Sequence, residues 1–542
     1  MAGACAPGAL AQSEPQLTTP HERPPAHPWM PRPTVAPAGT VTHCGPWERD
    51  GFRSIQVNVD ARGCNIVGDA ANEPSIAVDP TDPRKIVIGW RQFDSVLSDF
   101  RQAGWGYSHD GGHTWVFRGS LDPGVFGSDP VLAAGLNGHI YYLSINFDET
   151  RVFRSLDAGI TFRSRTQLVP YLYDKPWMVV DMTDGIGRGN IYITSATIYN
   201  RFFRSLDDGA SFTEYALGRN SETLTVAPDG AVYLALGGGG AGNEWDLTRS
   251  DNAANRSGVP SAATEAALCL SCLVGQSNLP NPGGLLGQLW VGAHRAGADS
   301  RRLVFLLGGV GLDPANIDLV DVAFMRSNDG GVTWDRPVVV NDDPPRRGSW
   351  QWFAMMSVAP NGRIDAVWND TRNSGQANLS ELFYSYSTDA GETWSKNIPI
   401  SPIFDSWVGW PQQAKLGDYY HMVSDNLGVN VAYAATFNGE QDIYFLRIGP
   451  WDCNGNEIDD ALDISEARSR DCNANGLPDE CEYRADANGD GLTTLSDFAA
   501  FQRALAGPEG TLTGGCTELL DPDHDGDVDL HDFYTLQSVF AP

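Results

Sequence analysis

Short runs in which apolar and polar residues alternate recur along most of the chain, and glycine, proline or asparagine usually bounds them. Residues 54–60 and 85–90 are two such runs. Alternation with a period of two predicts β-strands that bury one face and expose the other. The strand-sized runs continue to about residue 450, so we expect this part of the chain to be all-β.

One eight-residue motif returns between these runs. Its pattern is Ser-x-Asp-x-Gly-x-Thr-Trp, with Ser for Thr or Phe for Trp in some copies. The copies span residues 108–115, 155–162, 205–212, 327–334 and 387–394. A recurrence at about 50 residues indicates repeated supersecondary units. Each copy follows one strand and precedes another, which predicts a hairpin turn. The Asp accepts backbone hydrogen bonds, and the Gly permits a positive φ.

The motif resembles the Asp box of the sialidase-like (BNR/Asp-box repeat) β-propellers. The resemblance implies an all-β fold of blades around one axis. Aligning the inner strands gives seven units, which start near residues 72, 129, 175, 222, 288, 352 and 415. The fourth unit has a degenerate motif at Ser250–Asn255 and the seventh has none. We expect the strand at 54–60 to complete the seventh blade. If residues 240–300 form one insertion, the ring has six blades.

Beyond residue 450 the sequence becomes strongly acidic and the strand pattern ends. Two loops there place oxygen-bearing residues at positions 1, 3, 5 and 12 and Gly at position 6, the spacing of EF-hand calcium loops. Asp at position 12 and a single following helix resemble a dockerin module. The expected Ca²⁺ ligands are Asp486, Asn488, Asp490, Leu492, Thr494 and Asp497 in one loop, and Asp521, Asp523, Asp525, Asp527, Asp529 and Asp532 in the other.

Two runs ahead of these loops resemble thrombospondin type 3 calcium repeats. Their expected ligands are Asp452, Asn454 and Asn456, then Asp471, Asn473, Asn475 and Asp479. The predicted organisation is therefore a disordered segment or signal remnant at 1–50, a propeller at 51–450, calcium repeats at 451–482 and a dockerin-like pair of EF-hands at 483–542. Dockerins often carry small hydroxyl residues at positions 10 and 11. Here these are Leu495-Ser496 and Leu530-His531, so a cohesin-like partner and another surface partner both stay open.

The overall charge and the cysteines bear on location and partners. A net charge of −31 excludes the basic footprint that a nucleic-acid partner needs. No apolar run reaches the length of a membrane span. Nine cysteines, several beside the calcium loops, suit an oxidising compartment, and residues 1–15 end like a signal cleavage site. We expect a secreted protein, with Cys44–Cys64 and Cys472–Cys481 as trial disulfide pairs.

The functional face of such a propeller collects the starts of the inner strands and the ends of the second strands. In this chain those positions are mostly polar or aromatic, which suits a glycan or another polyhydroxylated ligand. They are Asn72, Glu73, Arg91, Asp94, Asp129, Asp148, Asp174, Lys175, Trp177, Glu222, Trp350, Gln351, Asp370, Arg372, Asp418 and Tyr419.

Sialidases use an arginine triad, an acid and a tyrosine nucleophile. By this resemblance the candidate catalytic residues are Arg91, Asp94, Arg372 and Tyr419, with Asp129 as another possible acid. The Arg-Ile-Pro signature of the family is absent, because Phe52-Arg53-Ser54-Ile55 does not match it. We therefore favour a secreted, calcium-binding propeller that binds glycans or extracellular proteins without turnover. The alternative is an exo-acting, sialidase-type glycoside hydrolase on acidic sugars, anchored by the C-terminal module.

Overall fold

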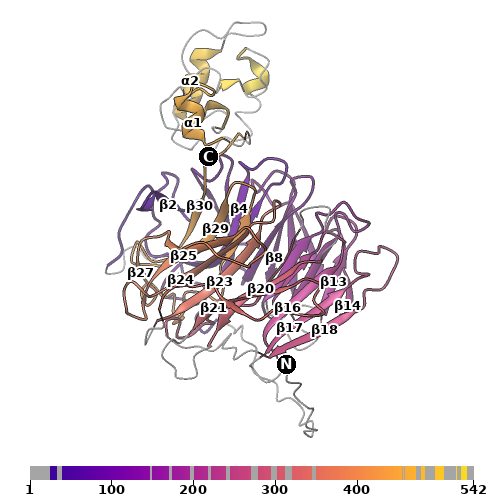
Figure 1. Ribbon diagram of the computed structural model, residues 1–542. Helices are drawn as coiled ribbons and strands as arrows, with labels where there is room; N and C mark the ends of the chain where they lie inside the picture. Colours follow the sequence, from indigo (N-terminus) through magenta and orange to yellow (C-terminus); the bar gives the residue numbers. More distant parts are fainter. Residues whose placement is uncertain are drawn as a thin grey trace.

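The computed structural model describes residues 25–32, 39–146, 149–169, 172, 174–195, 201–217, 221–239, 244–269, 279–294, 302–311, 320–344, 349–454, 456, 458–471, 478–481, 495–505, 520–521 and 527–533. Its strands form seven antiparallel sheets. The first strands of successive sheets pack against one another, and the last of them packs against the first. The sheets therefore surround one axis (Figure 1). The protein is a seven-bladed β-propeller.

Each blade is a meander that runs from the axis outward. Blade 1 contains β3 (Ala70–Val78), β4 (Ile86–Phe93), β5 (Gln102–Ser108) and β6 (Val116–Ser120). Blade 2 contains β7 (Ser128–Ala134), β8 (Ile140–Ile145), β9 (Thr150–Ser155) and β10 (Ser164–Leu168). Blade 3 contains β11 (Pro176–Val180), β12 (Ile191–Ser195), β13 (Arg201–Ser205) and β14 (Thr213–Ala216).

Blade 4 contains β15 (Thr223–Val226), β16 (Val232–Gly239), β17 (Glu244–Ser250) and β18 (Thr264–Cys269). Blade 5 contains β19 (Trp290–Ala293), β20 (Val304–Val310), β21 (Asp321–Ser327) and β22 (Val338–Val339). Blade 6 contains β23 (Gln351–Val358), β24 (Ile364–Asp370), β25 (Leu379–Ser387) and β26 (Ile398–Pro399), and β27 (Phe404–Asp405) also pairs with β25. Because β17 and β18 complete blade 4, the six-blade alternative is excluded.

Blade 7 closes the ring. It contains β28 (His421–Ser424), β29 (Val429–Ala435) and β30 (Asp442–Ile448), followed outward by β2 (Phe52–Gln56) and β1 (Trp47–Arg49). Ser54 pairs with Leu446, and the Tyr433 hydroxyl donates to Ser54 Oγ at 2.6 Å. The expected closure of the last blade by an N-terminal strand is confirmed. Strand β1 lies inside the stretch for which composition alone predicts disorder.

Two details differ from the sequence predictions. The innermost strand of blade 7 begins at His421, whereas the alignment placed it near residue 415. Gly417 has a φ of 95°, so the backbone turns there and cannot continue as a strand. Cys44 is bonded to Cys64, as predicted, but Cys481 is bonded to Cys453. The predicted Cys472–Cys481 pair is therefore wrong.

The Asp boxes form the expected turns between the third and fourth strands of their blades. In the second copy, Asp157 Oδ1 accepts the Thr161 N–H at 2.8 Å and Oδ2 accepts its hydroxyl at 2.6 Å. Ser155 Oγ donates to Asp157 and accepts the Gly159 N–H at 2.9 Å. These bonds satisfy the turn internally, so the motif is a folding device.

The Asp-box glycine also lets one blade approach the next. Gly391 has a φ of 84°, and a Cβ there would collide with the Phe324 ring of blade 5. We predict that Gly391→Ala lowers the free energy of unfolding by about 2–3 kcal/mol through backbone strain and overpacking. Gly375→Ala is the control, because Gly375 also has positive φ (67°) but its Cβ would meet nothing within 4 Å. Urea unfolding followed by tryptophan fluorescence measures both. Equal losses would show that the contact with Phe324 is unimportant.

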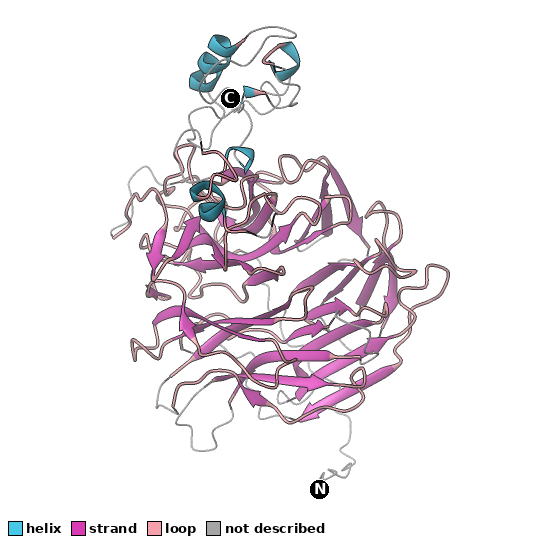
Figure 2. Ribbon diagram, turned by 45° about the horizontal axis from the view of Figure 1, so that its top comes forward, coloured by secondary structure: helices cyan, strands magenta, loops and turns pink. Residues whose placement is uncertain are grey.

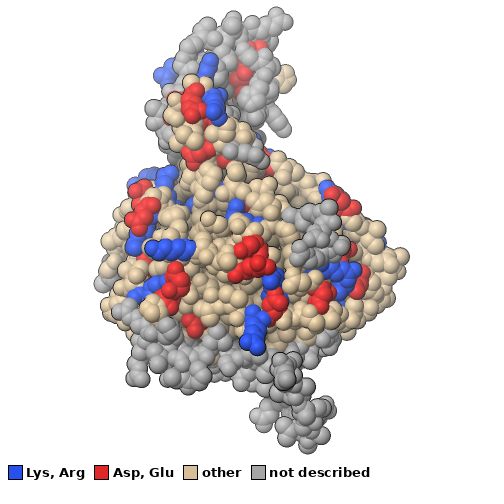
Figure 3. Space-filling model, viewed as in Figure 1, with Lys and Arg blue, Asp and Glu red and all other residues tan. Residues whose placement is uncertain are grey.

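The described helices follow the propeller in sequence (Figure 2). They are α1 (Asp460–Ser465), the 3-10 helix η1 (Asp479–Cys481) and α2 (Leu495–Ala504), and residues 530–533 are also helical. Trp451 contacts the rings of His113 and Phe445, so the chain leaves the propeller beside the Asp box of blade 1. None of the described helices has the length and apolar character to cross a membrane. On the face shown in Figure 3, acidic and basic side chains of the propeller are interspersed in small groups.

Candidate functional site

Charged residues lie at or near the start of the innermost strands of the first three blades. Glu73, Asp129 and Lys175 each precede a proline and have positive φ values of 53°, 47° and 40°. In blades 1 and 2 the pairing register shifts at this point, which marks a β-bulge. A residue with a side chain is strained in this conformation, by about 1–3 kcal/mol. Such bulges re-aim side chains and are frequent beside functional sites.

These residues belong to an axial charge cluster at one end of the propeller. We define the cluster as Glu73, Arg91, Asp129, Asp174, Lys175, Glu222, Lys415 and Asp418. All are buried except Asp418, whose side chain is 15% exposed. Arg91 Nε lies 3.0 Å from a Glu73 oxygen, and Lys415 Nζ lies 2.7 Å from Asp418 and 3.4 Å from Glu73. Lys175 lies 3.7 Å from Glu222.

Burial and ion pairing shift the pKa values of the carboxylates in this cluster in opposite directions. Burial raises the pKa of Glu73 to about 7, against the attraction of Arg91 and Lys415. Burial, with Asp129 nearby, raises the pKa of Asp174 well above its usual range. Burial also opposes ionisation of Asp418, but Lys415 and Lys175 outweigh it and hold the pKa of Asp418 below its usual range. The cluster therefore offers both proton donors and acceptors near neutral pH.

Two loops cover this end of the axis. Asn281 Nδ2 donates to the Gly417 carbonyl at 2.8 Å, and the Leu285 N–H donates to Asp418 Oδ1 at 2.9 Å. Gln413 accepts a bond from Arg91 Nη2 at 3.4 Å. The sequence predicted a polar mouth at this point. The polar groups are there, but segments 279–288 and 402–420 cover them, and sequence patterns do not reveal such long-range loop packing.

Three partly exposed tryptophans lie beside the covered end: Trp407 and Trp410 belong to one covering loop, and Trp29 bonds to Asp94 just after β4 of blade 1. We call them the tryptophan rim. Trp29 is 47% exposed and Trp407 is 38% exposed. Their indole N–H groups are already bonded within the protein, to Asp94, the Pro280 carbonyl and the Ser406 carbonyl respectively. The loop with Trp407 and Trp410 reaches blade 1, where Gln412 donates to the Val96 carbonyl at 3.4 Å.

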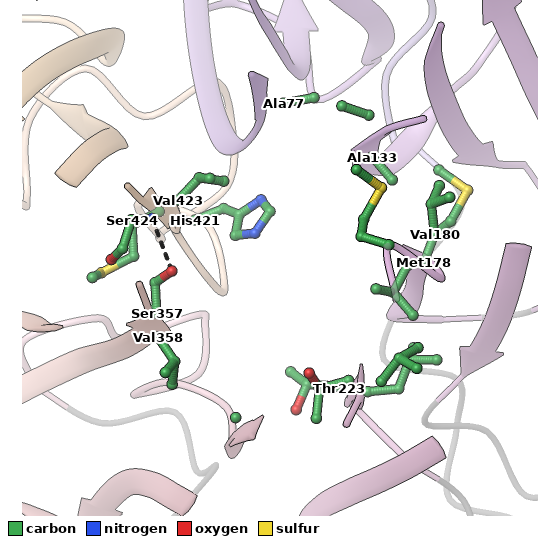
Figure 4. A pocket seen from close by; sticks show the side chains of 18 of the residues that line it. Ala77, Ala133, Met178, Val180, Thr223, Ser357, Val358, His421, Val423 and Ser424 are labelled. Atoms are coloured by element: carbon green, nitrogen blue, oxygen red, sulfur yellow. Dashed lines mark hydrogen bonds between the residues drawn. The ribbon is translucent and has the colours of Figure 1, made fainter. Parts of the chain in front are cut away.

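An aromatic layer separates the charge cluster from the rest of the axis. Trp177 meets Trp290 edge-on at 5.1 Å and Tyr419 at 5.7 Å between ring centroids. The His421 ring is stacked with Trp290 at 5.7 Å. Beyond this layer lies a cavity of about 420 Å³ lined by the innermost strands of all seven blades. Figure 4 shows its mainly apolar wall, including Met178, Val180 and Val423, and the bond from the Ser424 N–H to Ser357.

His421 makes the stability of the axis depend on pH. Burial lowers the pKa of His421 to about 3, and Nδ1 accepts the Ile76 N–H at 3.2 Å, which leaves the proton on Nε2. The folded-state pKa lies below the unfolded value of about 6.5, so the stabilisation is complete above pH 6.5 and lost as pH falls toward 3. We predict that wild-type protein loses about 1–2 kcal/mol more than His421→Asn between pH 7 and pH 5.

Urea unfolding at the two pH values measures this difference. His531→Asn is the control, because His531 lies outside the propeller and its side chain is 84% exposed, so its replacement leaves the axis intact. A His421→Asn variant with the wild-type pH dependence would contradict the assignment.

The candidate catalytic residues fall into different places. Arg91 and Tyr419 both lie at the axial charge cluster. Burial and the charge of Glu73 raise the pKa of Tyr419 there, and the charge of Arg91 lowers it. Asp94 lies at the tryptophan rim and accepts bonds from Trp29 at 2.7 Å and Gln102 at 2.8 Å. Arg372 lies in blade 6, where it contacts Asp342, Asp343 and Asp370 and its guanidinium covers the Phe383 ring. The structure thus brings Arg91 and Tyr419 together, but not Arg372.

Tyr419 has the geometry of a hydrogen-bond donor. Its hydroxyl donates to the Pro130 carbonyl at 3.0 Å, and burial, followed by the charges of Glu73 and Asp129, raises the pKa of Tyr419 well above its usual range. An activated nucleophile needs a base that accepts its proton. A backbone carbonyl does not accept a proton at neutral pH, so this arrangement positions the tyrosine rather than activating it.

Some predicted calcium ligands converge. Carboxylate oxygens of Asp527, Asp529 and Asp532 lie within 4.8 Å of one another, and Asp497 and Asp521 are buried. Asp471 and Asp479 are also among the described residues. Asp486, Asn488, Asp490, Leu492, Thr494, Asp523, Asp525, Asn473 and Asn475 lie outside the described residues, as does Asp148.

The first of the predicted calcium runs has a further candidate ligand that the sequence patterns did not single out. Asp463 in α1 is buried and accepts bonds from Asn454 at 3.1 Å and Asn456 at 2.6 Å. It stands eleven residues after Asp452, the same spacing that joins Asp521 to Asp532. That spacing could have identified Asp463 from the sequence. The Cys453–Cys481 disulfide lies beside Asp460, so these two cysteines offer no thiolate to a metal.

Residues 385–396, which contain the last Asp box, match the BNR/Asp-box repeat family. The protein is a propeller built on Asp-box repeats. No curated protein is significantly similar to the chain. A structure of a Dyadobacter fermentans protein of unknown function aligns at 13% identity and TM-score 0.38 over 74% of this chain and 100% of that chain. The leech intramolecular trans-sialidase aligns at 13% identity and TM-score 0.38, over 58% of this chain and 68% of that chain.

A Fusarium graminearum α-L-arabinofuranosidase of the GH93 family aligns at 10% identity and TM-score 0.31, over 60% of this chain and 93% of that chain. We base neither a substrate nor a reaction on these alignments.

Proposed function

We propose that this propeller binds a carbohydrate, on its own or attached to an extracellular protein, and does not turn it over. The observation that carries the proposal is the tryptophan rim beside a covered charge cluster. Trp29, Trp407 and Trp410 have their N–H groups bonded within the protein, so mainly ring surface is left for a ligand. Sugar rings combine apolar faces with hydroxyl groups, and such sites pair aromatic surface with a few polar groups.

The proposal is tested by titrating the full chain, in calcium, with a panel of acidic and neutral oligosaccharides and following tryptophan fluorescence. Trp407→Ala should weaken binding of any active sugar by tenfold or more, as expected for an aromatic anchor. Tyr386→Ala is the control, because Tyr386 is similarly exposed (40%) but lies on β25 of blade 6. Binding that is unchanged in Trp407→Ala would reject the rim as the site.

A second function has one observation in its favour. Glu73 is a buried carboxylic acid whose pKa is raised to about 7, as a general acid requires, and Arg91 and Tyr419 are nearby. An exo-acting, sialidase-type glycoside hydrolase would use these groups. Fluorogenic sialosides and other exo-glycosides test it with the full chain. We expect no turnover. Turnover that disappears in Tyr419→Phe would establish the hydrolase instead.

The segment after residue 450 is proposed to bind Ca²⁺ and to attach the propeller to a surface or a partner, with a cohesin-like protein as one possibility. Its support is the loop spacing and the convergence of Asp527, Asp529 and Asp532. The disulfides Cys44–Cys64 and Cys453–Cys481 fit an exported protein, because such bonds persist in oxidising compartments. Secretion of the full-length precursor from its host, assayed in culture medium, tests the location.

A further inference from the structure

Three carboxylates meet where the ring closes. Asp69 immediately precedes β3 of blade 1, Glu440 lies in the turn between β29 and β30, and Asp442 begins β30 of blade 7. One oxygen of each lies within 4.8 Å of the others, and the three residues are at most 1% exposed. None belongs to the axial charge cluster or to the calcium loops after residue 450. The sequence patterns gave no indication of this group.

The hydrogen bonds around the three carboxylates come from neutral donors. Glu440 accepts from the Asn65 side chain at 2.8 Å and from the Gly68 N–H at 2.9 Å. Asp442 accepts from the side chains of Asn58 at 2.8 Å and Asn438 at 2.9 Å. Gln92 donates to Asp69 Oδ2 at 2.9 Å. Such bonds orient the carboxylates but add no positive charge to offset them.

Two buried oxygens at this place accept no hydrogen bond within the described part of the chain. They are Oδ1 of Asp69 and Oδ1 of Asn438, and both residues are 0% exposed. Asn438 uses its amide nitrogen for Asp442, Gln56 and Tyr444, so its orientation is fixed. A buried acceptor without a donor is costly and points to a ligand that supplies positive charge. The charge of the exposed Arg32 lowers the pKa of Asp69 and of Glu440 against the effect of burial, but no ion pair joins Arg32 to either carboxylate in the described residues.

We propose that Asp69, Glu440 and Asp442 bind one calcium ion, which fastens the first blade to the last. The donors are all oxygens, as hard cations prefer, and neither histidine nor cysteine belongs to the group. Two oxygens at 2.3–2.6 Å from one Ca²⁺ are at most about 5 Å apart, so oxygens that lie within 4.8 Å of one another are close enough to share a single ion. Three carboxylates at one site favour Ca²⁺ over Mg²⁺, which is usually bound by only one or two carboxylates and keeps several waters.

The electrostatics agree with this geometry. Burial, then the charge of Glu440, raises the pKa of Asp69 to about 8, and burial raises the pKa of Glu440 to about 7. Three ionised groups are therefore unstable together here without a cation. Because Asn58 and Asn65 follow β2, the ion would also be held indirectly by the strand that completes the ring.

Hydrogen exchange of the full chain, with chelator or with calcium in excess, tests the proposal at the site itself. Calcium should slow exchange of backbone amides in peptides covering 65–71 and 438–443 by about tenfold or more. The Gly68 amide is one reporter, since it bonds directly to Glu440. Asp69→Asn should abolish the effect, and Glu440→Gln serves if Asp69→Asn does not fold.

Two controls separate this site from other effects. Asp532→Asn alters a C-terminal loop and should leave the protection at 65–71 and 438–443 intact. Asp181→Asn replaces an equally buried aspartate that is bonded to Thr183 in blade 3, so it should reduce stability but keep the calcium effect. Wild-type protein without calcium-dependent protection in these peptides, or folded Asp69→Asn that retains it, would overturn the proposal.

Discussion

Replacing Arg91 with methionine should reduce the free energy of unfolding of the propeller by about 3–5 kcal/mol. The Arg91 side chain is fully buried, and its Nε contacts Glu73 at 3.0 Å and Asn72 at 2.8 Å. Methionine has similar length and apolar bulk, so the main change is the loss of charge. Glu73 would then keep Lys415, at 3.4 Å, as its nearest base. Removing one partner of a buried ion pair is strongly destabilising because the other charge loses its compensation.

Urea unfolding of the full chain in calcium, followed by tryptophan fluorescence, measures the loss. The double variant Arg91→Met/Glu73→Gln should recover much of it, since the uncompensated acid is gone. Arg165→Met is the control, because Arg165 is an exposed arginine (59%) whose partner Asp122 is 29% exposed. It should lose clearly less than Arg91→Met. A small effect of Arg91→Met, or no recovery in the double variant, would contradict a tightly coupled cluster.

Removing calcium should unfold residues 484–542 and leave the propeller sheets folded at room temperature. The carboxylates of Asp527, Asp529 and Asp532 lie within 4.8 Å of one another, and repulsion between them opposes folding when no cation is bound. Far-ultraviolet circular dichroism should lose its helical component in chelator, and limited proteolysis should cut after residue 482. Binding energy and folding energy are the same quantity in such a module.

The variant Asp532→Asn tests the same dependence on calcium at a single ligand. The variant lacks one anionic ligand at position 12 of its loop, so it should need a higher calcium concentration to reach the same helical signal. Returning calcium to the chelated wild type should restore that signal. Helical signal and protease resistance that persist in chelator would show that the module folds without the ion.

The blade count could be predicted from sequence because it depends on local signals. An Asp box satisfies its own hydrogen bonds, and each of the first six blades is formed by consecutive strands, so the repeats favoured seven blades, although the degenerate fourth motif left a six-bladed ring open. The closing role of residues 54–60 followed from the missing motif of the seventh unit. Asp463 could also have been predicted, because its spacing from Asp452 is the same as that between positions 1 and 12 of the EF-hand-type loops.

The arrangement of the candidate site was not predictable in the same way. Whether Glu73 and Asp418 are open to solvent depends on Asn281 and Leu285, which lie far from both in sequence. The group of Asp69, Glu440 and Asp442 joins the two ends of the propeller, and no spacing rule connects them. Lys415 was interpreted as part of a strand, although Gly417 two residues later was a reason to expect a turn. Local patterns therefore predict the scaffold, and contacts between blades determine the site.

Closure of the ring by an N-terminal strand has a consequence for the order of events during protein synthesis. Asn58 bonds to Asp442, a residue 384 positions later. At about 5–20 residues per second, the ribosome needs about 20–80 s to make that stretch. Strand β2 has only β1 as a partner during this interval, because β30 has not yet been made, and blade 1 has no neighbour on one side. Early blades can form as they emerge, but the complete propeller must wait for the last blade. A translational pause before residue 442 would prolong exposure of the open seam to aggregation and chaperones.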